Sequence, residues 1–283
     1  MNTTKTQTAP DIQTIKARQK ATWESGDFGE VAKFIMLIAE QFMSRIVLKP
    51  GMKVLDAACG SGNLAVIAAH RGCVTSGLDI ASNLIAQARE RARKESLDIA
   101  FTEGDAEAMP YPDASFDAVV SMYGVMFAPR PERVVAELCR VTKPGGFIGM
   151  ANWTTEGFIG KMFAVFARHV PPPVGLPSPL LWGNEAAVTS RFNGTVKDLQ
   201  MTRYTARMCY PFDPAGTVDF FRRYYGPTHR AFAALAPAGQ DALRRDLVEL
   251  QTRHNVSPRP DETDTPAEYL EVHARRAGSN GTN

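Results

Sequence analysis

Three aspartates in the sequence stand where a carboxylate could meet a ligand. Asp56 ends the apolar run VLD, Asp79 ends GLD, and Asp105 follows the next apolar run in EGDAE. A glycine-rich stretch, GSGN at 60–63, begins four residues after Asp56. Such stretches between a strand and a helix hold nucleotides, because backbone N–H groups at the helix start face the ligand. We therefore expect a nucleotide-like ligand at this turn, surrounded by carboxylates.

The charge of Asp56 distinguishes between nucleotide-like ligands. GSGNLA at 60–65 has the form of the dinucleotide fingerprint G-x-G-x-x-A. A pyrophosphate about 4 Å from Asp56 would be repelled by roughly 4 kcal/mol at an effective dielectric near 20. The same carboxylate attracts a cation, and S-adenosylmethionine carries a sulfonium, an ammonium and only one carboxylate. Its ribose hydroxyls suit Asp79, its adenine amine suits Asp105, and its carboxylate can accept hydrogen bonds from the glycine turn.

Short apolar runs that alternate with helical patterns predict a parallel sheet with helices on both faces. Apolar residues at helical spacing also predict one amphipathic helix over 30–46, ahead of the first strand. The carboxyl ends of parallel strands share one edge, so the three aspartates should meet there. The predicted strands are 52–57, 74–79, 99–104, 116–122 and 146–153, and the helices between them are 63–70, 82–94 and 131–141.

The chain is expected to form one large domain behind a polar tail. The apolar share of 44% over 283 residues is enough for a large core. The tail covers 1–18 and the domain 19–283. Within the domain we expect a cofactor-binding core over 19–153, covering elements over 154–200 and 213–262, and the last strands over 201–212 and 267–276.

Composition argues against several classes of partner. The net charge is +2 and the basic residues are scattered, which disfavours nucleic acid and anionic membranes as partners. The four cysteines show no metal-binding spacing, so we expect reduced thiols and no metal site. The N-terminus has no apolar signal core, and the run FIMLIA is too short to span a bilayer. These features predict a cytoplasmic protein without membrane insertion, and a homodimer is compatible with them.

Four motifs follow one another over about residues 50–153: VLDAACGSGN, SGLDI, EGDAEAMPYPDASFDAVVSMYGVMFAP and LCRVTKPGGFIGMANW. In these motifs the chain resembles class I S-adenosylmethionine-dependent methyltransferases, and most closely the small-molecule group similar to enzymes of ubiquinone and menaquinone biosynthesis. The resemblance implies a Rossmann-like α/β fold with a seven-stranded, mostly parallel sheet whose last strand is antiparallel, and we expect a helical cap inserted late in the chain. The expected cofactor-binding residues are Asp56, Ala57, Gly60, Gly62, Asn63, Asp79, Ile80, Asp105, Ala106, Glu107, Ser121 and Met122, with Trp23 as a candidate lid over the cofactor.

The sequence gives no general base for the reaction. Methyl transfer from a sulfonium needs a nucleophile held in line and shielded from water, and a base only where the nucleophile must lose a proton. The segment after the fourth strand, SMYG, lacks the Asn/Asp-Pro-Pro-aromatic tetrad typical of methylases of nucleic-acid amines. Candidates for the acceptor pocket are Tyr123, Phe127, Trp153, Trp182 and Tyr225. Candidates for catalysis are Tyr123, Tyr225 and His229, while His70 and His169 are less suited.

The sequence thus predicts a methyltransferase that uses S-adenosylmethionine and methylates oxygen, sulfur or carbon of a small molecule. Three alternatives stay open: an NAD(P)-dependent oxidoreductase, a protein that binds the cofactor without catalysis, and an enzyme that uses the cofactor for another reaction. The first would favour a glycine loop without Asp56 beside it. The second would bind the cofactor without transferring a methyl group.

Overall fold

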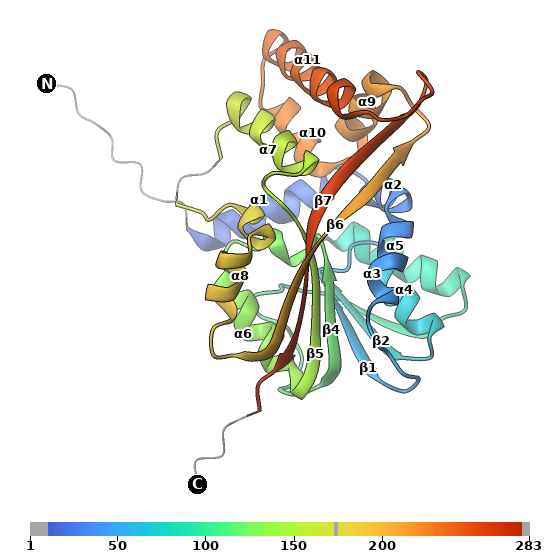
Figure 1. Ribbon diagram of the computed structural model, residues 1–283, viewed down its shortest axis with the longest axis vertical. Helices are drawn as coiled ribbons and strands as arrows, with labels where there is room; N and C mark the ends of the chain where they lie inside the picture. Colours follow the sequence, from blue (N-terminus) through green and yellow to red (C-terminus); the bar gives the residue numbers. More distant parts are fainter. Residues whose placement is uncertain (1–10, 173–174, 279–283) are drawn as a thin grey trace, which may run out of the picture.

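The computed structural model describes residues 11–172 and 175–278, which form a seven-stranded sheet in the order β3-β2-β1-β4-β5-β7-β6 (Figure 1). Strands β1 to β5 are parallel, and β7 runs antiparallel to both of its neighbours. The predicted Rossmann-like α/β fold is therefore confirmed. The strands are β1 (Lys53–Ala57), β2 (Val74–Asp79), β3 (Ile99–Glu103), β4 (Phe116–Met122), β5 (Thr142–Trp153), β6 (Val196–Tyr210) and β7 (Thr263–Arg276).

Helices cover both faces of the sheet and one end of it. α3 packs with α4 on one face beside α5, and α6 packs with α8 on the other. The cap helices α7, α9, α10 and α11 lie together at the carboxyl ends of the parallel strands, at the top of Figure 1. The helices are α1 (Ile12–Glu24), α2 (Phe28–Phe34), α3 (Met36–Ser44), α4 (Asn63–His70), α5 (Ser82–Lys94), α6 (Pro131–Val141), α7 (Phe158–His169), α8 (Glu185–Phe192), α9 (Pro214–Tyr224), α10 (Gly226–Ala233) and α11 (Pro237–His254), with short 3-10 helices η1 (Val125–Phe127) and η2 (Pro179–Gly183).

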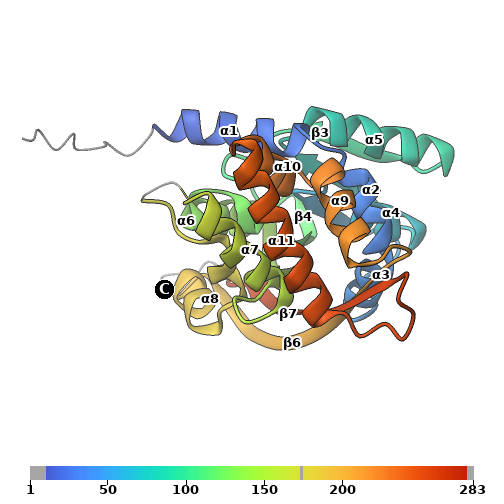
Figure 2. The same cartoon turned by 90° about the horizontal axis from the view of Figure 1, so that it is seen from above.

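The order of the strands reverses between β1 and β4. The chain moves from β1 to β2 and β3 on one side, and then returns to place β4 on the other side of β1. Open α/β sheets bind ligands at such a reversal, at the carboxyl ends of the strands. Figure 2 looks down on this end of the molecule, where α1 lies alongside α10 and α5.

The N-terminal part differs from the prediction in two ways. The helix predicted over 30–46 is two helices, because Ile35 leaves helical geometry at φ −108° and ψ 9°. The break turns Phe34 toward the cap, where its ring centroid lies 4.8 Å from that of Tyr210. The predicted tail over 1–18 is also too long: α1 begins at Ile12, since the Asp11 side chain caps its first turn. Residues 1–10 of that tail lie outside the described part of the chain.

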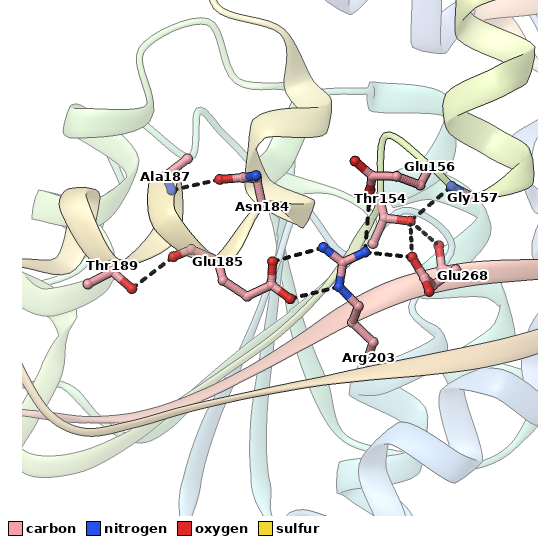
Figure 3. A network of polar contacts seen from close by, with 9 residues as sticks. All are labelled: Thr154, Glu156, Gly157, Asn184, Glu185, Ala187, Thr189, Arg203 and Glu268. Atoms are coloured by element: carbon pink, nitrogen blue, oxygen red, sulfur yellow. Dashed lines mark hydrogen bonds and ion pairs between the residues drawn. The ribbon is translucent and has the colours of Figure 1, made fainter.

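An ion-pair network ties α8 to the two long outer strands (Figure 3). Arg203 of β6 pairs with both carboxylate oxygens of Glu185 on α8, at 2.7 and 2.8 Å, and its Nη1 donates to Glu268 of β7 at 2.8 Å. Glu268 also accepts a hydrogen bond from Thr154, at the end of β5. β6 and β7 were predicted over 201–212 and 267–276, and both begin four or five residues earlier, at Val196 and Thr263.

No helix within 11–172 and 175–278 combines the length and the apolar composition needed to cross a bilayer.

Candidate functional site

A cavity with about 970 Å³ of space not filled by atoms lies at the carboxyl ends of β1, β2 and β4. Asp56, Asp79 and Asp105 all face it, although they come from three different strand ends. The fold therefore brings together the three carboxylates that the sequence singled out. The other predicted residues in its wall are Trp23, Gly60, Asn63, Ile80, Ala106, Met122, Tyr123 and Phe127.

The glycine loop that forms the floor of the cavity needs its glycines. Gly60 and Gly62 have φ values of 53° and 86°, in the left-handed region where residues with a Cβ are strained. A Cβ on Gly62 would also lie 3.0 Å from the Phe101 ring. Asp79 fixes the loop, because its Oδ2 accepts a hydrogen bond from the Gly60 N–H at 2.8 Å. The loop then leads into α4, which begins at Asn63.

Asp56 and Asp79 are buried carboxylates without a counterion. They are 1% and 8% exposed, and neither takes part in an ion pair among the described residues. Burial raises the pKa of Asp56 to about 7, while the hydrogen bond from the Ala65 N–H opposes the rise and the charge of Asp79 adds to it. Burial likewise raises the pKa of Asp79. A cationic ligand would supply the missing positive charge here, so the site fits a cation and disfavours a pyrophosphate.

Asp105 is held differently, by the N-terminal helix. The Lys16 ammonium of α1 contacts Asp105 and lies 2.6 Å from Glu107. Glu107 in turn pairs with Arg130, whose Nε lies 2.7 Å from a carboxylate oxygen. The Glu107 side chain is fully buried in these ion pairs and lies behind the cavity wall. Glu107 therefore holds Lys16 and Arg130 beside the cavity without facing it.

One face of α1 closes the cavity. Lys16, Gln19 and Trp23 line it, and Lys20 lies on the same face with its ammonium 2.9 Å from the Ile80 carbonyl. The Gln19 side-chain amide donates to the Phe127 carbonyl at 2.6 Å. Sequence reasoning missed Lys16 and Gln19, although their spacing from Trp23 corresponds to one helix face.

Aromatic rings cover the cavity above the glycine loop. Trp23, Phe28 and Phe127 line it, and the Trp23 ring centroid lies 5.7 Å from that of Phe28 and 4.9 Å from that of Phe127. Tyr225 lies behind them, and its ring centroid is 6.0 Å from that of Trp23. We call Trp23, Phe28 and Phe127 the aromatic roof.

Tyr123 lies in the wall at the end of β4. It has a φ of 58°, and its ring stacks on Trp153 with centroids 3.7 Å apart, so Trp153 lies behind it. The Tyr123 hydroxyl is buried and has no hydrogen-bond partner among the described residues. Burial holds the pKa of this hydroxyl well above its usual value, which makes it a poor proton acceptor. Trp182 packs elsewhere, against Phe192.

The remaining predicted residues lie beside the cavity and not in its wall. Ser121 accepts a hydrogen bond from the Val125 N–H at 3.3 Å and thereby holds the start of η1. Ala57 is fully buried at the end of β1, and Gly62 of the glycine loop stands just before α4, so neither lines the cavity. His229 of α10 turns toward α9, with Nδ1 3.3 Å from the Arg222 carbonyl oxygen. Nothing in this arrangement brings His229 to the three carboxylates.

Comparisons with known proteins agree with this geometry. Residues 55–150 match a family model described as a methyltransferase domain. An uncharacterized protein of Mycobacterium tuberculosis is 37% identical over 251 residues, which cover 87% of this chain and 91% of that protein. The demethylmenaquinone methyltransferase of Deinococcus radiodurans is 36% identical over 141 residues, 48% of this chain and 57% of that enzyme. A phosphoethanolamine N-methyltransferase of Haemonchus contortus, solved with S-adenosyl-L-methionine, shares the fold at a TM-score of 0.54 and 20% identity, over 85% of this chain and 52% of that one.

Proposed function

This chain belongs to the class I S-adenosylmethionine-dependent methyltransferases, and from that premise we propose that it methylates a small molecule in the cavity beside the glycine loop. The observation that carries the proposal is the pair of buried carboxylates, Asp56 and Asp79, that have no counterion among the described residues. A ligand that brings its own positive charge removes the cost of burying them.

We propose one role for each element of the floor. Asp56 lies opposite the positive end of the cofactor, Asp79 accepts hydrogen bonds from the ribose, and Asp105 accepts one from the adenine amine. The N–H groups around Gly60 and Gly62 donate to the cofactor carboxylate. S-adenosylmethionine supplies a methyl group that is already electrophilic, because it is bound to a positively charged sulfur. The protein therefore needs to orient the acceptor and exclude water.

The covering of the cavity supports a small acceptor. The aromatic roof and the inner face of α1 enclose it, and concave sites with apolar walls and a few convergent polar groups hold small ligands. We propose the division of labour expected from the sequence: residues 19–153 bind the cofactor, and the cap bounds the acceptor. Tyr225, between α9 and α10, contributes to that boundary because it packs behind Trp23.

The experiment that tests this function is a screen of acceptor libraries with methyl-labelled cofactor. We expect a product that carries the label and has gained one methylene unit in mass, together with release of S-adenosylhomocysteine. Cofactor binding without label transfer to any acceptor would favour a non-catalytic binding protein. A labelled product with a different mass change would identify another use of the cofactor.

A further inference from the structure

The charged groups of the cavity wall restrict the chemistry of the acceptor. We infer that the acceptor atom is a neutral nitrogen, of an amine or a ring, carried on an apolar body. The inference rests on the proposed function and narrows its acceptor, and it replaces the oxygen, sulfur or carbon expected from the sequence with nitrogen. Three observations carry it: the signs of the wall charges, the positions of the histidines, and the aromatic roof.

The wall offers no free cation to an anionic acceptor. Among the described residues its charged side chains are Lys16, Asp56, Asp79 and Asp105. The one ammonium among them, that of Lys16, is already held between Asp105 and Glu107. A carboxylate, phosphate or thiolate would therefore enter a wall with an excess of negative charge and meet no counterion. Desolvating an anion in such surroundings is unfavourable.

The wall also offers no free base to a hydroxyl, a thiol or a carbon acid. All five histidines lie outside it and contact other groups: His70 meets Glu95, His169 meets Asp246, His229 meets Arg222, His254 meets Lys161, and His273 meets Glu271. Burial raises the pKa of the Tyr123 hydroxyl and of the Cys59 thiol well above their usual values, so both stay protonated near neutral pH. Burial raises the pKa of Asp56 to about 7 and also raises that of Asp79, and the proposed place of both carboxyls is against the cofactor and not the acceptor.

A neutral nitrogen needs neither a counterion nor a base during the transfer. Its lone pair forms the new N–C bond while the S–C bond breaks, and the electron pair of that bond stays on sulfur. The positive charge passes from sulfur to nitrogen, so the net charge inside the cavity does not change. Where the nitrogen carries a hydrogen, the proton leaves to water after the product dissociates. The protein thus has no proton to accept at the moment of reaction.

The aromatic roof suits the charge that the nitrogen acquires. The roof lies in the wall above the glycine loop and consists of Trp23, Phe28 and Phe127. The ring centroid of Trp23 is 5.7 Å from that of Phe28 and 4.9 Å from that of Phe127. Aromatic faces attract ammonium groups through their quadrupoles, most strongly where water is excluded. The roof also provides the apolar surface that the body of the acceptor would cover.

The turnover test uses four probes with one body: 4-tert-butylaniline, 4-tert-butylphenol, 4-tert-butylthiophenol and 4-tert-butylbenzoate. Release of S-adenosylhomocysteine is measured at pH 7.5, after calorimetry has established that the protein binds this product. We expect the aniline to react at least tenfold faster than each of the others. Equal or faster methylation of the phenol, thiol or benzoate overturns the inference. If the phenol is methylated and its rate of methylation falls as the pH drops below 7, Asp56 would in addition be the group that accepts the phenol proton. Failure to bind S-adenosylhomocysteine would refute the proposed function itself.

A second test does not depend on turnover. The complex with S-adenosylhomocysteine is titrated with 4-tert-butyl-N,N,N-trimethylanilinium and with 4-tert-butylbenzoate, which have similar bodies and opposite charges. We expect the cation to bind at least tenfold more tightly. W23L should reduce that preference several-fold, and W23F should retain most of it because it keeps an aromatic face. A benzoate that binds as tightly as the cation overturns the inference.

Discussion

The floor and the roof of the cavity differ in how far apart their residues lie in the sequence. The floor is built from Asp56, Gly60 and Asp79, which lie close together in the chain at the ends of neighbouring strands. The roof joins Trp23 and Phe127 with Tyr225 behind them, and these residues come from distant segments. The floor is a motif that works wherever a strand, a turn and a helix follow one another. The roof exists only after the whole chain has folded.

The two regions are also held by different forces. Buried hydrogen bonds from backbone N–H groups fix the carboxylates of the floor. The roof depends on α1, which is attached by side-chain contacts such as those of Lys16 and Lys20, the latter one-third exposed. Exposed ion pairs contribute little to stability, while buried hydrogen bonds to charged groups contribute more. Changes in the floor should therefore affect cofactor affinity most, and changes in α1 least.

The largest effect is expected from Asp79→Asn in the floor. The substitution removes the buried carboxylate that we propose as the acceptor of the ribose hydrogen bonds, and it sets a side-chain amide against the N–H groups of Gly60 and Ala81. A hydrogen bond to a buried charge is worth about 1.5–3 kcal/mol. We expect affinity for S-adenosylhomocysteine to fall about 100-fold in calorimetry, while Asp113→Asn, on an exposed loop residue, leaves it unchanged. Unchanged affinity in Asp79→Asn would remove Asp79 from the cofactor site.

The second-largest expected effect is a pH dependence of cofactor affinity, which originates at Asp56. In the proposed site its ionised form attracts the cofactor ammonium, and burial raises its pKa in the free protein to about 7. Affinity should therefore fall as the pH drops from 7 to 5, by up to about tenfold per pH unit. Asp56→Asn should bind more weakly and lose most of this slope. A wild-type slope that persists in Asp56→Asn would assign it to another group.

The same carboxyl should also make the stability of the free protein depend on pH. Stability should fall as the pH rises, whereas cofactor affinity should rise. The folded state keeps this proton up to a pH of about 7, whereas the unfolded chain releases it near the ordinary value of 3.8. Stability therefore falls as the pH rises through that window, by about 4 kcal/mol at most for this group. Urea unfolding of wild type and Asp56→Asn between pH 4 and 8 measures the difference, which should be largest at pH 8.

A smaller effect is expected from Arg203→Ala in the network of Figure 3. Arg203 pairs with Glu185 and Glu268 but is 35% exposed, so we expect a loss of about 1 kcal/mol in unfolding free energy. Cofactor affinity should not change, because the network joins α8 to β6 and β7 and not to the floor. Arg253→Ala, which removes one exposed ion pair on α11, is the control and should cost less. A parallel loss of affinity would mean that this network and the floor are coupled.

The stability that the Arg203 network contributes should be lost at low pH. The Arg203 guanidinium lowers the pKa of Glu185 to about 2, although burial opposes the shift. The contribution of the pair is therefore complete above the ordinary glutamate pKa of 4.5 and is lost as the pH falls toward 2.

The smallest of the expected changes in cofactor affinity comes from Lys16→Met in α1. The substitution removes the contacts to Asp105 and Glu107 but leaves Arg130 on Glu107. We expect about threefold weaker binding of S-adenosylhomocysteine and faster hydrogen exchange of the α1 amides. Arg18→Met, on the exposed face of the same helix, is the matched control. Equal effects of the two variants would show that α1 is not held through Lys16.

The floor could be predicted from the sequence because its parts are local. Asp56, the glycine turn and Asp79 follow strands whose apolar runs are short and clear, and parallel strands bring their ends to one edge. The seven strands and the antiparallel last strand followed from the resemblance to a known family. The sequence alone did not predict that Asp56 is buried, and the structure shows that the last four residues of β1 all are.

The roof and the α1 contacts could not be predicted in the same way. No periodicity relates Trp23 to Phe127 or Tyr225, since their contacts depend on how three segments pack. Lys16 fell within a segment predicted as a polar tail, because helix formation there depends on the Asp11 cap and on burial of Ile15. The break at Ile35 was missed for a similar reason. The apolar pattern is continuous over 30–46 and does not mark the residue at which the chain turns between the cap and the sheet.

The most direct test is calorimetric titration of the protein with S-adenosylhomocysteine and, separately, with NAD at pH 7.5. If two buried carboxylates beside a glycine turn select an adenosyl ligand that carries an ammonium group and no pyrophosphate, the first compound should bind with micromolar affinity and the second should give no heat of binding. Binding of NAD, or no binding of S-adenosylhomocysteine, would contradict the account.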